Sequence, residues 1–259
     1  MRGDAGWLRG LVAGTGILMM TACAAGVPPS RLSVYLGSTA NQTSTSSPTI
    51  PPSPMRAGLV VISDTGAPDA APALPDEAVN RVAESLQQDL NRFLPIVRID
   101  AILSADGIGP GELGKIRDLG AKQGFDYVAV ALLSSTEQEY PMTLFLGWTS
   151  HAQPGYRRDN WSLAELAVVE VKTGQTLLRA EGRGMATLDW PAAPGINQWY
   201  PVIYLRPQDP ERRWWPPTYV GAPNTLRVVA MNQAVKRLVL GLQDAWIQKR
   251  QAELAQAGG

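Results

Sequence analysis

The 259-residue chain carries 23 basic and 23 acidic side chains, so its formal net charge at neutral pH is zero. Without a basic excess it lacks the electrostatic field on which nucleic-acid binding depends, and its length suffices for one large domain or two small ones. Its single cysteine, Cys23, excludes an intramolecular disulfide and a metal site of the CxxC type.

The first 22 residues have the pattern of a secretory signal peptide. Arg2 and Arg9 precede an apolar run from Leu11 to Met20, and small residues follow. Because this run is too short to span a bilayer as a permanent anchor, we expect residues 1–22 to be removed on export.

Cys23 comes directly after this pattern, and its context has three interpretations. The sequence Met20–Cys23 resembles a bacterial lipobox, in which the cysteine is acylated and begins the mature chain. Alternatively, Ala22-Cys23-Ala24 is an A-x-A site whose cleavage releases a soluble protein, or Cys23 is only a small apolar residue of the leader. We favour the lipobox because the lone cysteine lies at the expected distance from the amino terminus. The resemblance implies a stable lipid anchor on Cys23 and, with Ala24 rather than Asp next, the periplasmic face of the outer membrane.

Residues 23–57 are predicted to form a lipid-anchored tether. The stretch from 37 to 55 is rich in Ser, Thr and Pro and poor in large apolar residues, so it cannot bury enough surface to offset its ordering entropy. Before it, Ser30–Gly37 alternates apolar and other side chains, which predicts a short strand or a docking segment.

The remaining residues, 58–259, are predicted to fold as one periplasmic domain. The pattern first predicts a strand at Leu59–Asp64, a helix from Pro75 to Pro95, a strand at Ile96–Leu103 and a weak helix over 110–123. It then predicts a strand at Phe125–Tyr140 and a loop to about Trp161. A hairpin of Ser162–Lys172 and Gln175–Met185 around Thr173-Gly174 follows, and a helix from Thr225 to about Ala255 comes last. This order, β-α-β-α-β-β-β-α, predicts an α/β (α+β) fold with a mixed sheet of about five strands and helices packed on it.

Two stretches of this domain resemble bacterial envelope lipoproteins. "GFDYVAVALL" after a helix and "LAVVEVKTGQTLLRAEGRG" are similar to the pattern of the curli-secretion lipoprotein and of penicillin-binding-protein activator lipoproteins. "SRLSVYLG" also resembles rhombotarget lipoproteins, although the chain ends in "AQAGG" without the carboxy-terminal tail of rhombosortase substrates. The resemblance implies a fold and a compartment and supplies no catalytic residues.

Few residues carry catalytic chemistry. His151 is the only histidine and lies in a predicted loop, so neither a nucleophile triad nor a zinc site is expected, and no cofactor is predicted. Glu137 and Glu139 would share one face of a strand and could serve glycoside hydrolysis, although a solvated strand end is the favoured interpretation. The glycine-rich stretch 107–114 is interpreted as a turn rather than an anion site.

The stretch from 189 to 224 is an aromatic and proline-rich insertion. Its side chains are those that dominate protein interfaces, and we predict that a partner binds Trp199, Tyr200, Arg212, Arg213, Trp214, Trp215 and Tyr219. In the alternative the segment is a lid that packs on the sheet, and carbohydrate stacking is a third possibility.

Together these observations predict a non-enzymatic, lipid-anchored periplasmic binding or scaffold protein in envelope assembly or secretion. The membrane, through the lipid, and an envelope protein are the expected partners, and nucleic acid is not. The alternatives are a glycan hydrolase that uses Glu137 and Glu139, and an oligomeric secretion component; the sequence does not specify an oligomeric state.

Overall fold

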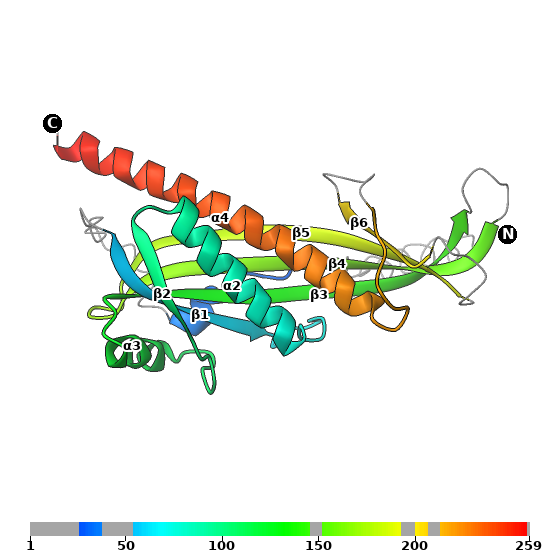
Figure 1. The fold of residues 1–259 in the computed structure, drawn as a ribbon, viewed down its shortest axis with the longest axis horizontal. Coiled ribbons are helices and arrows are strands. Elements are labelled where there is room, and N and C mark those ends of the chain that lie inside the picture. Colours follow the sequence, from blue (N-terminus) through cyan, green and yellow to red (C-terminus); the bar gives the residue numbers. More distant parts are fainter. Residues whose placement is uncertain (1–25, 38–53, 146–151, 193–199, 207–212, 258–259) are drawn as a thin grey trace, which may run out of the picture.

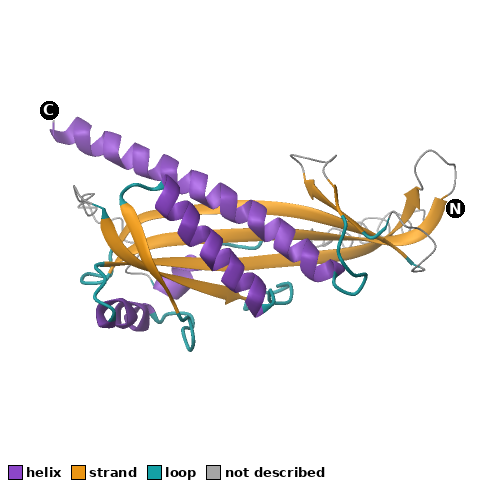
Figure 2. Cartoon of the chain, viewed as in Figure 1, coloured by secondary structure: helices purple, strands orange, loops and turns teal. Residues whose placement is uncertain are grey.

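Seven strands form a single sheet, and helices pack on both of its faces (Figures 1 and 2). The computed structural model describes residues 26–37, 54–145, 152–192, 200–206 and 213–257. In chain order the elements are α1 (Leu32–Leu36), β1 (Met55–Asp64), α2 (Asp76–Phe93), β2 (Val97–Leu103), α3 (Leu113–Lys122), β3 (Tyr127–Phe145), β4 (Ala152–Glu170), β5 (Thr176–Pro191), β6 (Val202–Arg206), β7 (Arg213–Trp214) and α4 (Ala222–Ala257).

The strand order across the sheet is β2-β1-β3-β4-β5-β6-β7. β1 is parallel to both β2 and β3, because α2 and α3 return the chain to the same end, and every later pairing is antiparallel. The predicted mixed α/β fold is therefore confirmed. The predicted count of about five strands and the predicted element order are wrong, because β6 and β7 extend the sheet and a helix, α1, precedes β1.

The central hairpins are longer than predicted. The turn at Thr173-Gly174 joins β4 and β5 as expected, and Gly174 has a φ of 77°, which glycine adopts at little cost. However, β3 and β4 pair without interruption from Tyr127↔Glu170 to Phe145↔Ala152, so the loop predicted up to Trp161 is largely strand. The sequence there is polar and contains Pro and Gly, so its strand propensity is low and a loop was predicted. In the structure, polar pairs across the two strands stabilise the strand.

One face of the sheet, here called the α4 face, carries α2 and α4 (Figure 1). The predicted helix from Pro75 is confirmed, and its side chains Val82, Leu86 and Leu90 are buried, whereas Phe93 is exposed. On β5, Gly182 and Gly184 allow α4 to lie directly on the strand. A Cβ atom at Gly184 would be 2.1 Å from the carbonyl oxygen of Ala230.

The opposite face, here called the α1 face, carries α1 and α3 over one end of the sheet (Figure 1). A second apolar cluster lies there and includes Leu32, Tyr35 and Leu36 of α1. Ser30–Gly37 is therefore a docking segment, but it contains a helix instead of the alternative strand, because three of its large side chains fall on one helical face.

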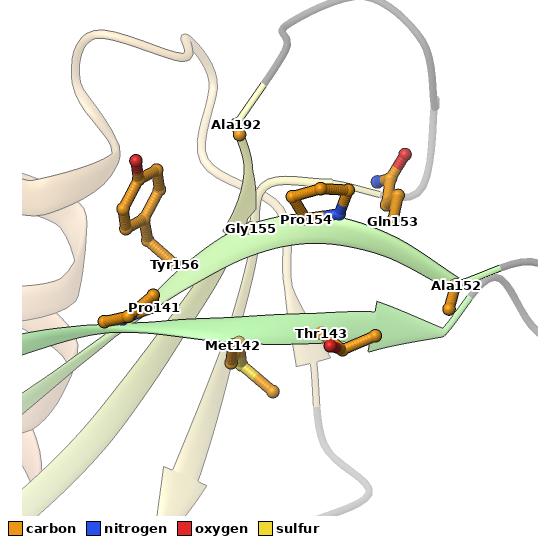
Figure 3. Close-up of a pocket in the computed structure, with 9 residues that line it drawn as sticks. All are labelled: Pro141, Met142, Thr143, Ala152, Gln153, Pro154, Gly155, Tyr156 and Ala192. Atoms are coloured by element: carbon orange, nitrogen blue, oxygen red, sulfur yellow. The ribbon is translucent and has the colours of Figure 1, made fainter.

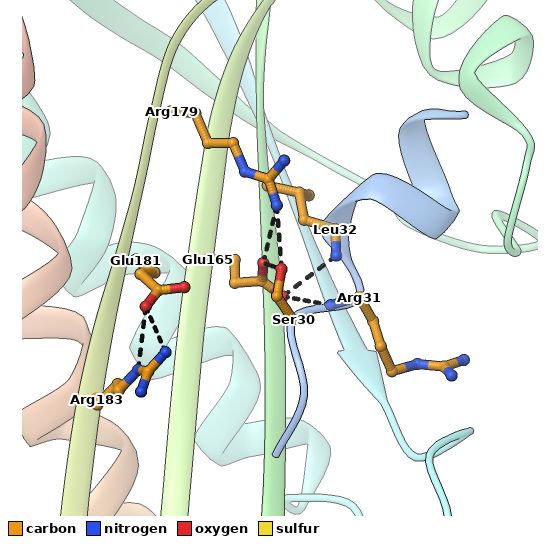
Figure 4. A network of polar contacts seen from close by, with 7 residues as sticks. All are labelled: Ser30, Arg31, Leu32, Glu165, Arg179, Glu181 and Arg183. Carbon is orange, nitrogen blue, oxygen red and sulfur yellow. Dashed lines mark hydrogen bonds and ion pairs between the residues drawn. The ribbon is translucent and has the colours of Figure 1, made fainter. Parts of the chain in front are cut away.

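Polar contacts fasten this segment to the sheet (Figure 4). The carboxylate of Glu165 on β4 is 1% exposed and accepts hydrogen bonds from the Ser30 hydroxyl and from the backbone N–H groups of Arg31 and Leu32. Asp64 accepts hydrogen bonds from Arg31 Nε at 2.6 Å and from the Tyr35 hydroxyl at 3.0 Å. The predicted signal peptide, Cys23 and residues 38–53 of the predicted spacer lie outside the described residues.

Helix side chains bind backbone groups on the edge strand β2 and on β5. On β2, the Asn91 side chain of α2 donates to the carbonyl oxygen of Ile99 and accepts from its N–H. On β5, Gln233 of α4 accepts from the N–H of Met185, and Arg237 donates to a neighbouring carbonyl oxygen. Within the described residues, no helix is long and apolar enough to cross a membrane.

Candidate functional site

Beyond α1, the α1 face of the sheet presents polar and aromatic side chains in cross-strand rows. Paired residues on neighbouring strands project to the same face, so the pairing register defines these rows. They are Thr136, Trp161, Met185 and Arg206; Gln138, Asp159, Thr187, Tyr204 and Arg213; and Tyr140, Arg157, Asp189 and Val202. We call these thirteen residues the arginine–tyrosine surface; five of them are buried within it, namely Thr136, Asp159, Thr187, Asp189 and Val202.

Two buried aspartates organise this surface. Asp189 accepts two hydrogen bonds from Arg157, each 2.7 Å long. These bonds are the main reason why the pKa of Arg157 is raised. Asp159 accepts hydrogen bonds from the Tyr140 hydroxyl at 2.9 Å and from the Thr187 hydroxyl at 2.6 Å. Because charge-assisted bonds of this kind hold both partners in one orientation, the surface is rigid where β3, β4 and β5 meet.

The tyrosines of this surface are hydrogen-bond donors rather than bases. Burial raises the pKa of Tyr204, and the negative charge of Asp189 raises it further. Burial likewise raises the pKa of Tyr140 and of Tyr200, which precedes β6. These phenols stay protonated at neutral pH, so they act as hydrogen-bond donors and not as proton acceptors, and the Tyr140 donor is already taken by Asp159.

Two arginines flank the ring of Tyr204. The guanidinium carbon of Arg206 lies 5.4 Å from the ring centroid and that of Arg213 lies 5.8 Å from it. Within the part of the chain that the structure describes, no ion pair joins either arginine to a carboxylate. Both guanidinium groups therefore lie against the ring of Tyr204, and no described carboxylate neutralises their charge.

The other face of the same strands carries Trp190 and Trp214, and Trp215, Tyr219 and Val220 lie in the chain between β7 and α4; we call these five residues the aromatic corner. The rings of Trp190 and Tyr219 stack with centroids 5.8 Å apart, and the Tyr219 hydroxyl donates to the carbonyl oxygen of Pro191 at 2.6 Å. Trp214 packs against the apolar cluster beneath the start of α4. In contrast, Trp215 is 55% exposed and Val220 is 89% exposed.

The structure divides the predicted partner-binding residues between these two surfaces. Arg213 belongs to the arginine–tyrosine surface, and Tyr200 lies close enough for Tyr204 and Asp189 to influence its pKa. Trp214, Trp215 and Tyr219 belong to the aromatic corner. Trp199 and Arg212 lie outside the described residues. The insertion also contains regular structure, since β6 and β7 lie within it.

Tyr140, Arg157 and Asp159 were not among the predicted site residues. The last two fall in the stretch predicted as a loop, and a loop has no cross-strand register that would place an arginine beside a particular aspartate. The one available signal was the mixture of charged and aromatic residues at Tyr156–Trp161.

The glutamates of the alternative enzyme prediction lie on the α4 face, as their spacing predicts. Glu137 forms a bidentate ion pair with Arg227 of α4 at 2.7 and 3.0 Å, and Glu139 pairs with Arg158 at 2.7 Å. The side chain of Glu137 is 12% exposed, so the interpretation of a solvated strand end does not hold for it. His151 lies outside the described residues.

A shallow hollow of about 540 Å³ lies at the tip of the β3–β4 hairpin (Figure 3). Pro141, Met142, Pro154 and Tyr156 line much of it, and no carboxylate or basic side chain does. Among the residues that the structure describes, no group of three or more His, Cys, Asp or Glu side chains could hold a metal ion.

No protein-family model matches the chain, and no curated protein does. Several solved structures show a distant similarity. A neuraminyllactose-binding hemagglutinin homolog from Helicobacter pylori is 12% identical over 76% of this chain and 88% of that one, with a TM-score of 0.35. PelC from Paraburkholderia phytofirmans, solved as a dodecamer, is 16% identical over 78% and 95%, with a TM-score of 0.29. The hypothetical protein CT253 from Chlamydia trachomatis is 11% identical over 74% and 98%, with a TM-score of 0.34. Similarities of this size carry no information about what this chain binds.

Proposed function

We propose that the chain is a non-enzymatic binding protein of the bacterial cell envelope, held at the periplasmic face of the outer membrane by a lipid on Cys23. In this proposal the aromatic corner binds a protein partner in envelope assembly or secretion. The observation that carries the proposal is the exposure of Trp215 and Val220 beside a rigid aromatic frame.

The frame supports a binding role because it keeps the exposed groups in place before a partner arrives. The stacked ring of Trp190 lies beneath the Arg158 guanidinium, whose carbon is 5.1 Å from the ring centroid, and Tyr219 is hydrogen-bonded to the backbone. Trp214 is fixed by the cluster of Ile203 and Leu226. Little conformational entropy is then lost when a partner covers Trp215, and buried tryptophans are among the strongest interface anchors.

Replacing one tryptophan at a time separates binding from packing. Trp215→Ala is expected to weaken binding by more than about 2 kcal/mol, roughly thirtyfold, and to leave the melting temperature unchanged. Leu254→Ala is the matched control, because Leu254 is 61% exposed but lies far away on α4. The measurement is recovery of the partner after cross-linking in intact envelopes, together with thermal melts of each purified variant. A Trp215→Ala variant that binds normally, or that loses stability as much as binding, would contradict the proposal.

The lipid anchor has its own test. Cys23→Ser is expected to abolish metabolic labelling with fatty acid and to release the protein from the outer-membrane fraction. If the variant still fractionates with the outer membrane, something other than a lipid on Cys23 holds the protein there.

A further inference from the structure

The docked amino-terminal segment determines how far a lipid on Cys23 can lie from the sheet. The segment is part of the fold, because Glu165 and Asp64 bind its backbone and side chains and α1 is buried in the second apolar cluster. Its first described residue, Gly26, accepts a hydrogen bond from the Thr136 hydroxyl on β3. Only two residues, Ala24 and Ala25, lie between Gly26 and Cys23, and the three residue steps that join them span at most about 3.5 Å each. Chain length alone therefore limits a lipid on Cys23 to about 10 Å from Gly26, which is hydrogen-bonded to Thr136.

The proline-rich spacer does not lengthen this connection. Residues 38–53 follow α1 and precede β1, and both of these elements are packed in the domain. A spacer in that position links two parts of the folded domain, whereas the link between lipid and domain is the short stretch before Gly26. The domain is consequently held close to the bilayer rather than free to reach away from it.

The direction of the segment shows which part of the domain is closest. Ser30 contacts Glu165, whose cross-strand partner on β3 is Leu132, whereas Gly26 contacts Thr136, four residues further along β3. Followed back toward Cys23, the chain runs along the α1 face to Thr136, the first β3 residue of the arginine–tyrosine surface.

The chemistry of that surface fits lipid headgroups. Arg206 and Arg213 carry charge that no described carboxylate neutralises, and guanidinium groups bind phosphate oxygens in a bidentate manner. Tyr140 is 36% exposed, and aromatic side chains with a polar tip are enriched where a protein meets the bilayer–water interface. Basic side chains close to an anionic membrane surface add attraction.

We propose that the arginine–tyrosine surface lies against the membrane and contacts the phosphates of its lipid headgroups. The α4 face and Tyr156 then point away from the bilayer toward the periplasm. This inference rests on the lipid anchor in the proposed function, but it makes no use of the aromatic corner or of its partner.

Hydroxyl-radical footprinting tests the orientation without altering the surface. The chain from Cys23 onward is produced unacylated, since every described contact lies within residues 26–257, and a maleimide phospholipid is coupled to Cys23, the only cysteine. The anchored protein is then bound to vesicles of phosphatidylethanolamine and phosphatidylglycerol. Tyr140 and Tyr156 are a matched pair, because they are 36% and 41% exposed at the same end of the sheet but on opposite faces.

Each outcome has one meaning. We expect vesicle binding to remove most of the oxidation of Tyr140 and to leave Tyr156 unchanged. Protection of both tyrosines would mean that the hairpin tip points into the membrane, and protection of neither would mean that the domain does not rest on it; either result overturns the proposal. Because the lipid is coupled chemically, these results do not depend on whether the cell acylates Cys23.

A second measurement tests the headgroup contact itself. The same chain without a coupled lipid is sedimented with anionic phosphatidylglycerol vesicles, and Arg206→Gln with Arg213→Gln is expected to lower partitioning on the order of fivefold for each arginine. Arg81→Gln with Arg98→Gln removes the same charge from exposed positions elsewhere and is the control. Circular dichroism melts of each variant check folding. An equal effect of the two pairs would show attraction by net charge alone and would contradict a specific contact surface.

Discussion

The close packing of α4 on β5 can be tested with a single methyl group, by the substitution Gly184→Ala. The new Cβ atom would lie 2.1 Å from the carbonyl oxygen of Ala230 and 2.8 Å from the amide nitrogen of Ala234, and both are helix backbone atoms that no rotamer change can move. The helix would have to withdraw by about 1 Å, and a gap of this size forfeits a quarter to a half of the dispersion energy across it. Overpacking costs about 1–3 kcal/mol in ordinary cores, so we expect a loss of about 3 kcal/mol here.

Urea denaturation of the purified protein, followed by tryptophan fluorescence and by circular dichroism, measures this loss. Gly114→Ala is the control, because Gly114 lies in α3 with no atom within 4 Å of the added methyl. Replacing a glycine by alanine inside a helix stabilises it by up to about 1 kcal/mol, so the control should move in the opposite direction. A Gly184→Ala variant that loses less than about 1 kcal/mol would refute the direct contact between α4 and β5.

Three further predictions concern the polar contacts of the fold. Glu165→Gln removes the charge that binds the amino-terminal segment, so we expect faster hydrogen exchange at Leu32 and a loss of about 2–3 kcal/mol. In Tyr35, burial first and hydrogen bonding second raise the pKa to about 12. Below pH 10 the phenol is protonated in both the folded and the unfolded chain. Between pH 10 and 12 only the unfolded chain loses the proton. The free energy of unfolding of the wild type should therefore fall by about 1.4 kcal/mol per pH unit relative to Tyr35→Phe, measured by denaturation at each pH. Arg227→Met removes the bidentate partner of Glu137 and leaves it the Asn160 amide at 3.1 Å and Arg158 at 4.0 Å. It should cost about 1.5–3 kcal/mol in urea denaturation, most of which the added change Glu137→Met should restore.

The part of the fold that sequence predicts is the part in which local patterns agree with packing. The helix at Asp76–Phe93 has Pro before its first turn, acids within that turn and an apolar stripe, so every local signal gives the same answer. The β4–β5 hairpin is predictable for a similar reason, since β-branched residues flank a turn with Gly174 at positive φ. Where the apolar alternation stops, at Ala152–Trp161, the prediction of a loop was wrong.

The candidate site was less predictable because its contacts are distant in sequence. Arg157 and Asp189 are 32 residues apart, and the ion pair between Arg227 and Glu137 spans 90 residues. Neither distance has a local signature, and both pairs follow from the strand register and from the position of α4. Composition alone indicated that the insertion from 189 to 224 was unusual, but the division of its residues between two faces depends on β6 and β7.

The helix side chains that bind the backbone of β2 and β5 have a consequence for copies of the chain at high local concentration. Anchoring many copies in two dimensions raises their effective concentration, and an open sheet edge then becomes a template for strand addition and aggregation. Here Asn91 occupies both backbone groups of Ile99 on β2, and Gln233 and Arg237 occupy groups on β5. Neighbouring copies therefore find these backbone positions of β2 and β5 already hydrogen-bonded, which disfavours strand addition there.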